Sequence, residues 1–239
     1  MKKVLFCSML VPLFLTGCVF VFENKMRGNG DVTVEQRAVT SFDKISIDGV
    51  FKVYLTQGDT EQVEVEIDEN LQQHVNVYNK GNTLYLNIEK GVNWGKTTKN
   101  NVYISLKSID QLSIGGVCAV ETHTILNLEN LKLDVDGVSN NSLELTCNQL
   151  EVDMSGVGNI ELAGETHKLT VKKDGVGKFD AGDLIAAIVN IRNSGVGSAY
   201  IYATEELSMT NSGVGSIYYS GDAVIKLMKS DGIGKIQKK

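Results

Sequence analysis

In the second half of the chain, apolar and polar residues alternate in short runs. The apolar members come in pairs two positions apart, namely Leu131 and Leu133, Leu150 and Val152, Leu169 and Val171, Val189 and Ile191, and Leu207 and Met209. A period of two places successive side chains on opposite faces of a strand. No segment of this half shows a helical pattern of about ten residues or more. The pattern therefore predicts an all-β fold.

A glycine followed by Val or Ile separates these runs, and this phrase occurs seven times. The glycines lie 18 to 21 residues apart and are Gly116, Gly137, Gly156, Gly175, Gly195, Gly213 and Gly232. A fixed period of this length is typical of a repeat architecture. Short strands joined by tight turns at this period predict a β-solenoid with coils of ~19 residues, ~33 Å long if seven coils stack at ~4.8 Å. A glycine-rich β-sandwich is the alternative.

Stacked coils place equivalent residues above one another. We expect the residues after the glycines to form an internal aliphatic ladder of Val117, Val138, Val157, Val176, Val196, Val214 and Ile233. The residues before the glycines would form a polar ladder of Asp136, Ser155, Asp174, Ser194, Ser212 and Asp231. The glycines themselves are expected to have a positive φ and no room for a Cβ atom.

The first half lacks the short period, and residues 31–110 are expected to form an irregular β-rich part ahead of the solenoid at 111–239. Strict alternation from Val63 to Ile67 predicts a strand, and Val75 to Tyr78 with Thr83 to Ile88 predicts a hairpin. Residues 42–58 read FDKISIDGVFKVYLTQG, where DGV repeats the turn phrase. This segment is expected to be a first, longer coil.

The first residues carry the pattern of an export signal. Lys2 and Lys3 precede an apolar stretch that is too short to span a ~30 Å hydrocarbon core, so residues 1–17 are interpreted as a signal peptide. Leu15-Thr16-Gly17-Cys18 resembles the bacterial lipobox, which predicts lipidation of Cys18 and a linker over 18–30. Val19, and not Asp, follows the cysteine, and by resemblance to the proteobacterial sorting rule for lipoproteins this favours the outer membrane of a Gram-negative bacterium. The alternative is an ordinary signal peptide with a chance cysteine.

Composition narrows the possible partners. The formal net charge is -6 and the chain has no basic block, so nucleic acid is not an expected partner. The only proline is Pro12, which suits a mature chain whose strands are paired on both sides. Cys118 and Cys147 occupy different positions in the repeat. We expect two buried free thiols there, with a disulfide as the alternative.

The sequence shows no catalytic or cofactor motif. His74, His123 and His167 lack metal-ligand spacing, so no metal or cofactor is expected. Carboxylates are the one candidate for catalysis, because Asp134, Asp136 and Asp153 fall in neighbouring coils and paired carboxylates serve as acid and base. However, Ser replaces Asp136 in later repeats, and Ser can cap a turn but cannot act as a catalytic acid.

Tyrosines give the best indication of a binding face. Tyr200 and Tyr218 occupy the same position in successive repeats, and Tyr202 lies two residues further on. Stacked tyrosines on an outer face can hold sugar rings or a protein partner. The alternative is a ladder that only stabilises neighbouring coils.

Four segments together resemble a known family. FDKISIDGVFKVYLTQG, VEVEIDENL at 63–71, GNTLYL at 81–86 and the SGVG-type repeats are similar to the putative auto-transporter adhesin head (GIN) domain family, over roughly residues 31–239. The resemblance implies a right-handed parallel β-helix in a bacterial cell-envelope protein, often a lipoprotein, and it supplies no catalytic residues.

The resulting hypothesis is a non-enzymatic envelope lipoprotein that acts as an adhesin or binding scaffold. It would be anchored to the membrane through lipid on Cys18 and would offer a side face of the solenoid to a glycan or an envelope protein. Two alternatives remain open. One is a β-helix carbohydrate-active enzyme, a polysaccharide lyase or hydrolase, that uses the carboxylates on one face. The other is a structural component of an envelope assembly that pairs through the end of the solenoid.

Overall fold

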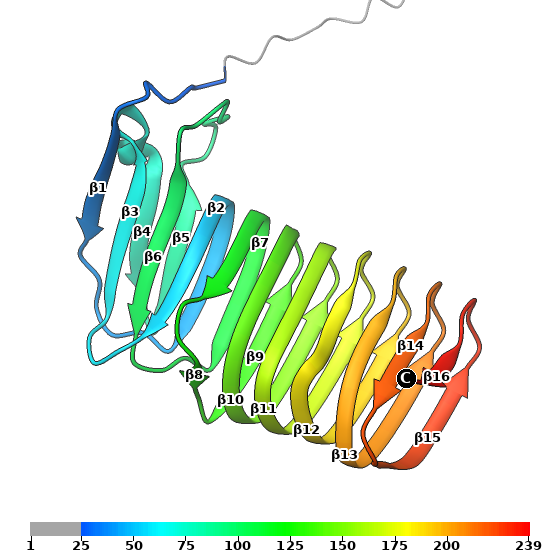
Figure 1. Ribbon diagram of the computed structural model, residues 1–239. Coiled ribbons are helices and arrows are strands. Elements are labelled where there is room, and N and C mark those ends of the chain that lie inside the picture. Colours follow the sequence, from blue (N-terminus) through cyan, green and yellow to red (C-terminus); the bar gives the residue numbers. More distant parts are fainter. Residues whose placement is uncertain (1–24) are drawn as a thin grey trace, which may run out of the picture.

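The computed structural model describes residues 25–239, and a sheet of sixteen strands winds through them (Figure 1). The predicted signal peptide at 1–17 and the predicted lipidation site Cys18 lie outside the described residues. Within the described residues, no helix has the length and apolar character needed to cross a membrane.

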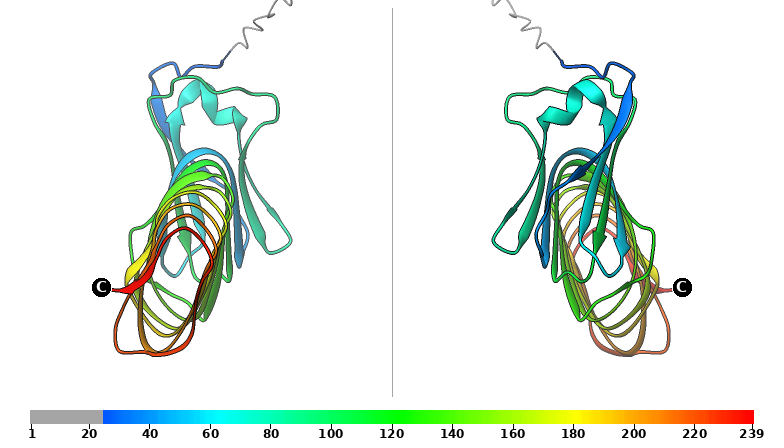
Figure 2. Two further views of the ribbon diagram at one scale, coloured as in Figure 1. Left: turned by 90° about the vertical axis from the view of Figure 1, so that its right-hand side faces the viewer. Right: turned by 90° about the vertical axis from the view of Figure 1, so that its left-hand side faces the viewer.

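The second half is a β-solenoid, as the repeat predicts. Its strands are β7 (Gln111–Thr122), β8 (Leu126–Asn127), β9 (Asn130–Val135), β10 (Val138–Met154), β11 (Val157–Lys173), β12 (Phe179–Asn193), β13 (Ala199–Asn211), β14 (Ile217–Ser220), β15 (Val224–Ser230) and β16 (Ile236–Lys238). Neighbouring coils pair in parallel, for example β10 with β11 and β11 with β12. The end-on views show the coils stacked behind one another (Figure 2). The predicted period of about 19 residues is confirmed.

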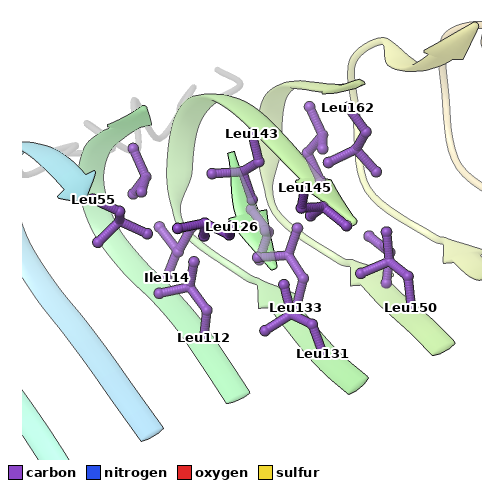
Figure 3. Close-up of a cluster of buried hydrophobic side chains, with 14 of the residues drawn as sticks. Leu55, Leu112, Ile114, Leu126, Leu131, Leu133, Leu143, Leu145, Leu150 and Leu162 are labelled. Atoms are coloured by element: carbon purple, nitrogen blue, oxygen red, sulfur yellow. The ribbon is translucent and has the colours of Figure 1, made fainter. Parts of the chain in front are cut away.

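The predicted alternation fills the interior of the coils. Leu150 pairs in register with Leu131 on one side and with Leu169 on the other, and all three side chains are buried. Leu133 and Leu145 pack in the same core (Figure 3). Each added coil buries another layer of aliphatic side chains, and this burial is the main force that stacks the coils.

The residues after the turn glycines do not form an internal ladder, so that prediction is wrong. They stack in register from coil to coil, as Val157, Val176 and Val196 do, but their side chains point to solvent. The alternation along the strand explains this direction. Leu169 and Val171 point inward, and the next inward positions are Lys173 and Gly175. Val176 is left on the outside. The polar ladder before the glycines is also exposed, and Ser194 donates a hydrogen bond to Asp174.

The turn glycines are required by space rather than by φ. A Cβ atom on Gly175 would lie 2.1 Å from the carbonyl oxygen of Gly156 in the coil before. The expectation of a positive φ holds for Gly116 and is wrong for the other six predicted glycines. The positive φ lies two residues later, for example at Gly177 with φ +137°. Both glycines permit close stacking, since a Cβ atom on Gly177 would lie 1.6 Å from the carbonyl oxygen of Gly158, and Gly177 also supplies the positive φ.

The first half forms a cap at one end of the solenoid. Its elements are β1 (Val32–Arg37), β2 (Lys44–Gln57), β3 (Gln62–Asp68), the 3-10 helix η1 (Glu69–His74), β4 (Val75–Lys80), β5 (Thr83–Ile88) and β6 (Asn100–Leu106). The predicted strand is β3, and the predicted hairpin is β4 with β5. β1, β3 and β6 pair antiparallel, whereas β2 pairs in parallel with β6 and β7.

β2 joins the cap to the solenoid. Its Val50 pairs with Val117 of β7, so the phrase Asp48-Gly49-Val50 lies directly beside the first repeat. This confirms the expected first, longer coil.

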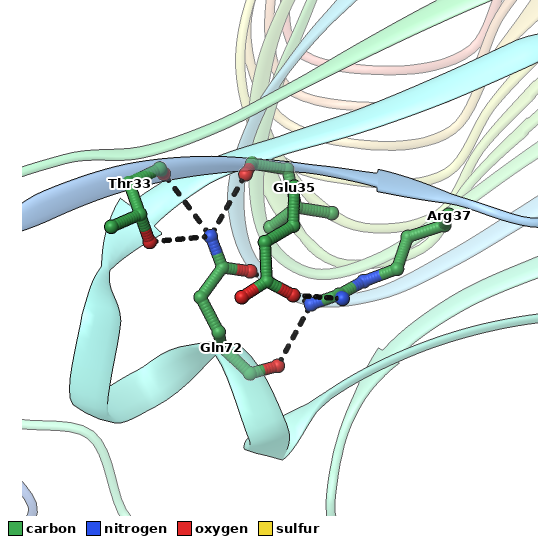
Figure 4. A network of polar contacts seen from close by, with 5 residues as sticks. Thr33, Glu35, Arg37 and Gln72 are labelled. Carbon is green, nitrogen blue, oxygen red and sulfur yellow. Dashed lines mark hydrogen bonds and ion pairs between the residues drawn. The ribbon is translucent and has the colours of Figure 1, made fainter.

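Polar side chains tie the cap together. The buried Gln72 on η1 donates hydrogen bonds to the carbonyl oxygens of Thr33 (3.1 Å) and Val65 (3.0 Å). Arg37 donates to the carbonyl oxygen of Gln72 at 2.9 Å (Figure 4). Asp68 is also buried and accepts hydrogen bonds from the backbone N–H groups of Gly30 and Thr98. These contacts hold η1 against β1 and β3 and fix the segments that precede β1 and β6.

Cys118 and Cys147 are both buried and free, as predicted. Burial raises the pKa of both thiols. A protonated thiol inside the core is unreactive, so the two residues act as small apolar side chains.

Candidate functional site

The two tyrosines predicted at equivalent repeat positions meet on the outer face of the solenoid. Tyr200 of β13 and Tyr218 of β14 are partners in the parallel register. Their rings stack with 4.9 Å between centroids and 10° between planes. The ammonium group of Lys239 lies 5.2 Å from the centre of the Tyr200 ring. The register therefore converts a sequence repeat into an aromatic pair.

This pair forms a wall of a cavity of about 370 Å³. The other lining residues are Lys178, Asp180, Gly182, Asp183, Ile201, Tyr219, Ser220 and Lys239. Tyr202, the third predicted tyrosine, is not among them and pairs in register with Ser220. Tyr219 lines the cavity, although its position in the repeat gave no reason to select it.

Charged groups stand beside the aromatic wall. The ammonium group of Lys178 lies 2.9 Å from a carboxylate oxygen of Glu161 and 3.2 Å from one of Asp180. These hydrogen bonds, first to Glu161 and then to Asp180, raise the pKa of Lys178. The second oxygen of Asp180 accepts a hydrogen bond from the backbone N–H of Gly182 at 3.1 Å. The cavity thus offers both a cation and fixed carboxylates.

A bulge in β12 shapes this part of the surface. The register between β12 and β13 shifts between Ala181 and Ile185, and Gly182 and Asp183 lie within the shifted segment. A bulge adds residues to one strand and redirects their side chains. Asp183 is exposed there and lines the cavity.

A second cavity of about 440 Å³ continues along the same face. It shares Asp180 and Asp183 with the first and is otherwise lined by Thr122, Ser142, Leu143, Glu144, Glu161, Leu162 and Ala163. The two cavities form one groove that crosses successive coils, which we call the tyrosine groove. Its lining alternates hydroxyl and carboxyl groups with aliphatic side chains.

The carboxylates proposed for catalysis lie elsewhere. Asp134 and Asp153 are register partners on neighbouring strands, but each is paired with a lysine, at 3.1 Å with Lys132 and 3.3 Å with Lys172, respectively. Asp136 is exposed at its turn. None of the three aspartates lines the tyrosine groove. The register therefore brings Asp134 and Asp153 side by side, each with a lysine, whereas Asp136 lies apart from them at its turn.

The three histidines are separated in space as well as in sequence. His74 contacts Glu89 at 2.7 Å, His123 lies against the ring of Tyr54, and His167 is exposed. No group of three or more His, Cys, Asp or Glu side chains suited to a metal ion occurs within residues 25–239.

The arrangement of the groove suits a polar ligand with apolar faces. Aromatic rings cover carbon-bound hydrogens, while nearby carboxylate and ammonium groups bind hydroxyls. Tyr200 and Tyr218 were detectable from the repeat. Asp180 was not, because the residue type at its position changes from coil to coil. It joins the site because it pairs in register with Tyr200.

Comparison with known proteins gives one family and several similar structures. The family model described as "Putative auto-transporter adhesin, head GIN domain" matches residues 41–223. The crystal structure of a putative adhesin from Bacteroides fragilis is 30% identical, covers 90% of this chain and 100% of that chain, and has a TM-score of 0.87. No protein of curated function matches the sequence.

Two further crystal structures come from Parabacteroides species. A putative adhesin from Parabacteroides merdae is 25% identical, covers 89% of this chain and 99% of that chain, and has a TM-score of 0.68. A putative lipid binding protein from Parabacteroides distasonis is 20% identical with a TM-score of 0.66, over 89% of this chain and 99% of that chain. The latter similarity shows the fold alone.

Proposed function

We propose that this chain, which belongs to the family of putative auto-transporter adhesin head GIN domains, is a non-enzymatic envelope adhesin that binds a glycan in the tyrosine groove. The observation that carries the proposal is the stacked pair of Tyr200 and Tyr218 in the wall of a cavity that also holds Asp180 and Lys178. The adhesin descriptions of the family and of the Bacteroides fragilis relative support a binding role at the cell surface.

A glycan fits this chemistry better than an apolar ligand. A sugar ring has apolar C–H patches that pack on aromatic rings and hydroxyl groups that need donors and acceptors. Tyr200 and Tyr218 provide the first, and Asp180, Asp183 and Lys178 provide the second. The two cavities adjoin at Asp180 and Asp183 and are lined by residues of successive coils, which suits a linear chain of sugars.

The proposal includes anchoring through lipid on Cys18. The lipobox-like sequence Leu15-Thr16-Gly17-Cys18 supports it, and the description of the family as adhesins supports a location in the cell envelope. Growth with a labelled fatty acid tests it, because the full chain should carry label and Cys18→Ala should not. Equal labelling of the two chains would contradict the anchor without affecting the proposal for the groove.

Glycan binding is tested with the purified full chain on a glycan array, followed by affinity measurements on any sugar that binds. We expect Tyr200→Ala and Tyr218→Ala each to weaken binding at least about tenfold, which corresponds to ~1.4 kcal/mol. Tyr200→Phe should retain most of the affinity, because the aromatic surface remains.

The cap supplies a matched control. Tyr78 and Tyr85 also stack, with ring centroids 5.3 Å apart, and Tyr78 is exposed. Tyr78→Ala should therefore leave glycan binding unchanged. The proposal fails if no glycan binds, or if Tyr78→Ala weakens binding as much as Tyr200→Ala does.

A further inference from the structure

The outward-pointing residues at the turns form a continuous apolar line. Eight of them stack in register through successive coils, and we call them the valine ridge: Val50, Val117, Val138, Val157, Val176, Val196, Val214 and Ile233. Their exposed fractions run from 39% to 75%. The turns that carry the ridge form the upper edge of the solenoid in Figure 1. At ~4.8 Å per coil, the ridge is ~34 Å long.

Stacking between coils does not explain the residue type. A β-branched side chain packs well on its copy in the next coil, but threonine is also β-branched and would leave a hydroxyl in water. All eight positions are instead Val or Ile. Together they expose several hundred Å² of apolar surface, which is the size at which patches on monomers mark interaction sites.

The flanks of the ridge carry charge in a repeating order. Three rungs of the ridge have an aspartate two residues before the apolar residue and a lysine two residues after it. The pairs are Asp48 and Lys52, Asp174 and Lys178, and Asp231 and Lys235. The chain crosses the ridge at each rung, within β2 at Val50 and through a turn at Val176 and Ile233, so the aspartates line one flank and the lysines line the other.

This order of charges is complementary to that of a second copy of the chain whose solenoid runs parallel to the first. A two-fold axis along the ridge places each rung against the same rung of the second copy and exchanges the two flanks. Asp174 of one copy then faces Lys178 of the other, and the other two pairs match in the same way. The antiparallel alternative instead sets Asp48 against Asp231 and Lys52 against Lys235, which are like charges.

A lipid surface fits the ridge less well. Both flanks would face a membrane surface, so the aspartates at positions 48, 174 and 231 offset the attraction of Lys52, Lys178 and Lys235 to anionic lipids. The ridge also lacks the aromatic side chains that anchor proteins at a membrane interface.

We propose that the valine ridge is the interface of a parallel homodimer, in which two solenoids meet turn to turn with equivalent coils side by side. The apolar area of the ridge is smaller than the ~800 Å² that each partner buries in a standard interface, so the dimer is weak and reversible. The charged flanks determine the register more than the affinity, because Lys178 and Asp174 are partly exposed and already have partners within the chain. The parallel arrangement also leaves both N-termini at the same end.

Single cysteines on the ridge test the proposal. Val117→Cys, Val176→Cys and Val214→Cys are made separately in the full chain, produced in cells and treated with copper phenanthroline, which oxidises thiols that meet. In the parallel dimer, every one of these cysteines meets its own copy, so each variant should form a disulfide-linked dimer. The unsubstituted chain and Val34→Cys, an exposed position on β1 outside the ridge, are the controls and should remain uncrosslinked.

The same experiment distinguishes the orientations. Val117 and Val214 lie on the second and seventh of the eight rungs, so an antiparallel dimer would crosslink them only when the two variants are mixed. That result would overturn the parallel arrangement, and crosslinking no stronger than in the controls would overturn the interface. As a further check, Val157→Lys with Val196→Lys should reduce crosslinking through Val176→Cys at least about fivefold, while the circular dichroism spectrum stays that of the folded chain.

Discussion

The cap and the solenoid hold their cores together in different ways. In the cap, side chains far apart in sequence make specific polar contacts, such as the hydrogen bonds from Gln72 to the carbonyl oxygens of Thr33 and Val65. In the solenoid, each repeat pairs with the next repeat about 19 residues away. Backbone hydrogen bonds and an aliphatic core hold neighbouring coils together. The cap therefore depends on individual side chains, and the solenoid depends on a repeated geometry.

This difference predicts how each part fails. A change to the repeated geometry disturbs two interfaces at once, because each coil contacts the coils on both sides. A change to a polar contact in the cap leaves unsatisfied groups at one place only. Four substitutions test the comparison, from the largest expected effect to the smallest.

Gly175→Val should destabilise the protein most. Its Cβ would lie 2.1 Å from the carbonyl oxygen of Gly156, and this oxygen belongs to backbone that cannot move without separating two coils. We expect a loss of more than ~4 kcal/mol in the free energy of unfolding, measured by chemical denaturation. Gly81→Ala in the hairpin of the cap is the control, because no atom lies within 4 Å of its Cβ position. A loss as small as the ~1–2 kcal/mol expected for that control's positive φ would contradict the role of close stacking.

Asp68→Asn should have the next largest effect. The carboxylate accepts hydrogen bonds from Gly30 N–H at 2.9 Å, Thr98 N–H at 2.8 Å and the Thr98 hydroxyl at 2.8 Å. An amide nitrogen in place of one oxygen cannot accept, so at least one donor loses its hydrogen bond to a charged group, at a cost of ~1.5–3 kcal/mol. Asp59→Asn, on an exposed loop, should change stability by less than ~0.5 kcal/mol and is the control.

The same carboxylate makes stability depend on pH. Burial alone would raise the pKa of Asp68, but the hydrogen bonds from Thr98 and Gly30 outweigh it and lower the pKa. The stabilisation is therefore fully present above the ordinary pKa near ~3.9 and is lost as the pH falls through the lower pKa of the folded state. Below pH ~4, the free energy of unfolding obtained from denaturation curves should decrease less steeply with falling pH for Asp68→Asn than for the unsubstituted chain. Parallel curves would contradict the assignment.

Lys173→Met should stabilise the solenoid. Lys173 points inward and is fully buried, and its ammonium group donates one hydrogen bond, to the carbonyl oxygen of Val196 at 2.9 Å. Burying a polar group with so few partners costs ~1–3 kcal/mol, whereas methionine fills a similar volume without that cost. We expect a gain of ~1 kcal/mol and a rise of ~2–4 °C in the melting temperature. A lower melting temperature would show that the hydrogen bond outweighs the burial of the amine.

The gain should shrink at high pH. Burial lowers the pKa of Lys173 in the folded state. Between that value and the ordinary pKa of ~10.4, the unfolded chain binds the proton and the folded chain does not, so the unsubstituted protein becomes more stable as the pH rises. As the pH is raised in the alkaline range, the melting temperatures of Lys173→Met and of the unsubstituted chain should therefore converge. A constant difference would contradict a buried amine as the cause.

Val157→Thr should have the smallest effect. The side chain lies on the exposed ridge, and threonine keeps the β-branched shape that stacks between Val138 and Val176. We expect a change below ~0.5 kcal/mol in the free energy of unfolding of the monomer. Leu150→Ala in the buried ladder is the comparison, with an expected loss of ~2–5 kcal/mol. Similar losses for the two variants would place the ridge inside the core.

Particular residues show where prediction from the sequence succeeded and where it did not. The period of the glycines predicted the coils, and the alternation of Leu169 and Val171 predicted the inward face. Extending that alternation by two and four residues would also have placed Lys173 and Gly175 inside and Val176 outside. The error came from treating Val176 as buried because it is apolar, although a tight turn has room only for glycine on its inner side.

The candidate site was predicted in part. The repeat identified Tyr200 and Tyr218, because residues at equivalent positions must stack in a solenoid. It did not identify Asp180, Asp183 or Tyr219. Asp180 joins the groove as the register partner of Tyr200, and Asp183 lies in the bulge of β12, which follows no repeat. The closure of the cap by Asp68 was also not predictable, since its partners lie 30 and 38 residues away and follow no period.

By itself, the sequence determined most of the strands, the length of the coil and the register of the coils at their turns. These depend on local alternation and on a period, and both are visible along one dimension. Only the tertiary structure decided which charged groups stand beside the tyrosines, where β12 bulges and how the polar side chains of the cap pair. Those features arise where segments without a common period meet, and their energies depend on distances that no local pattern contains.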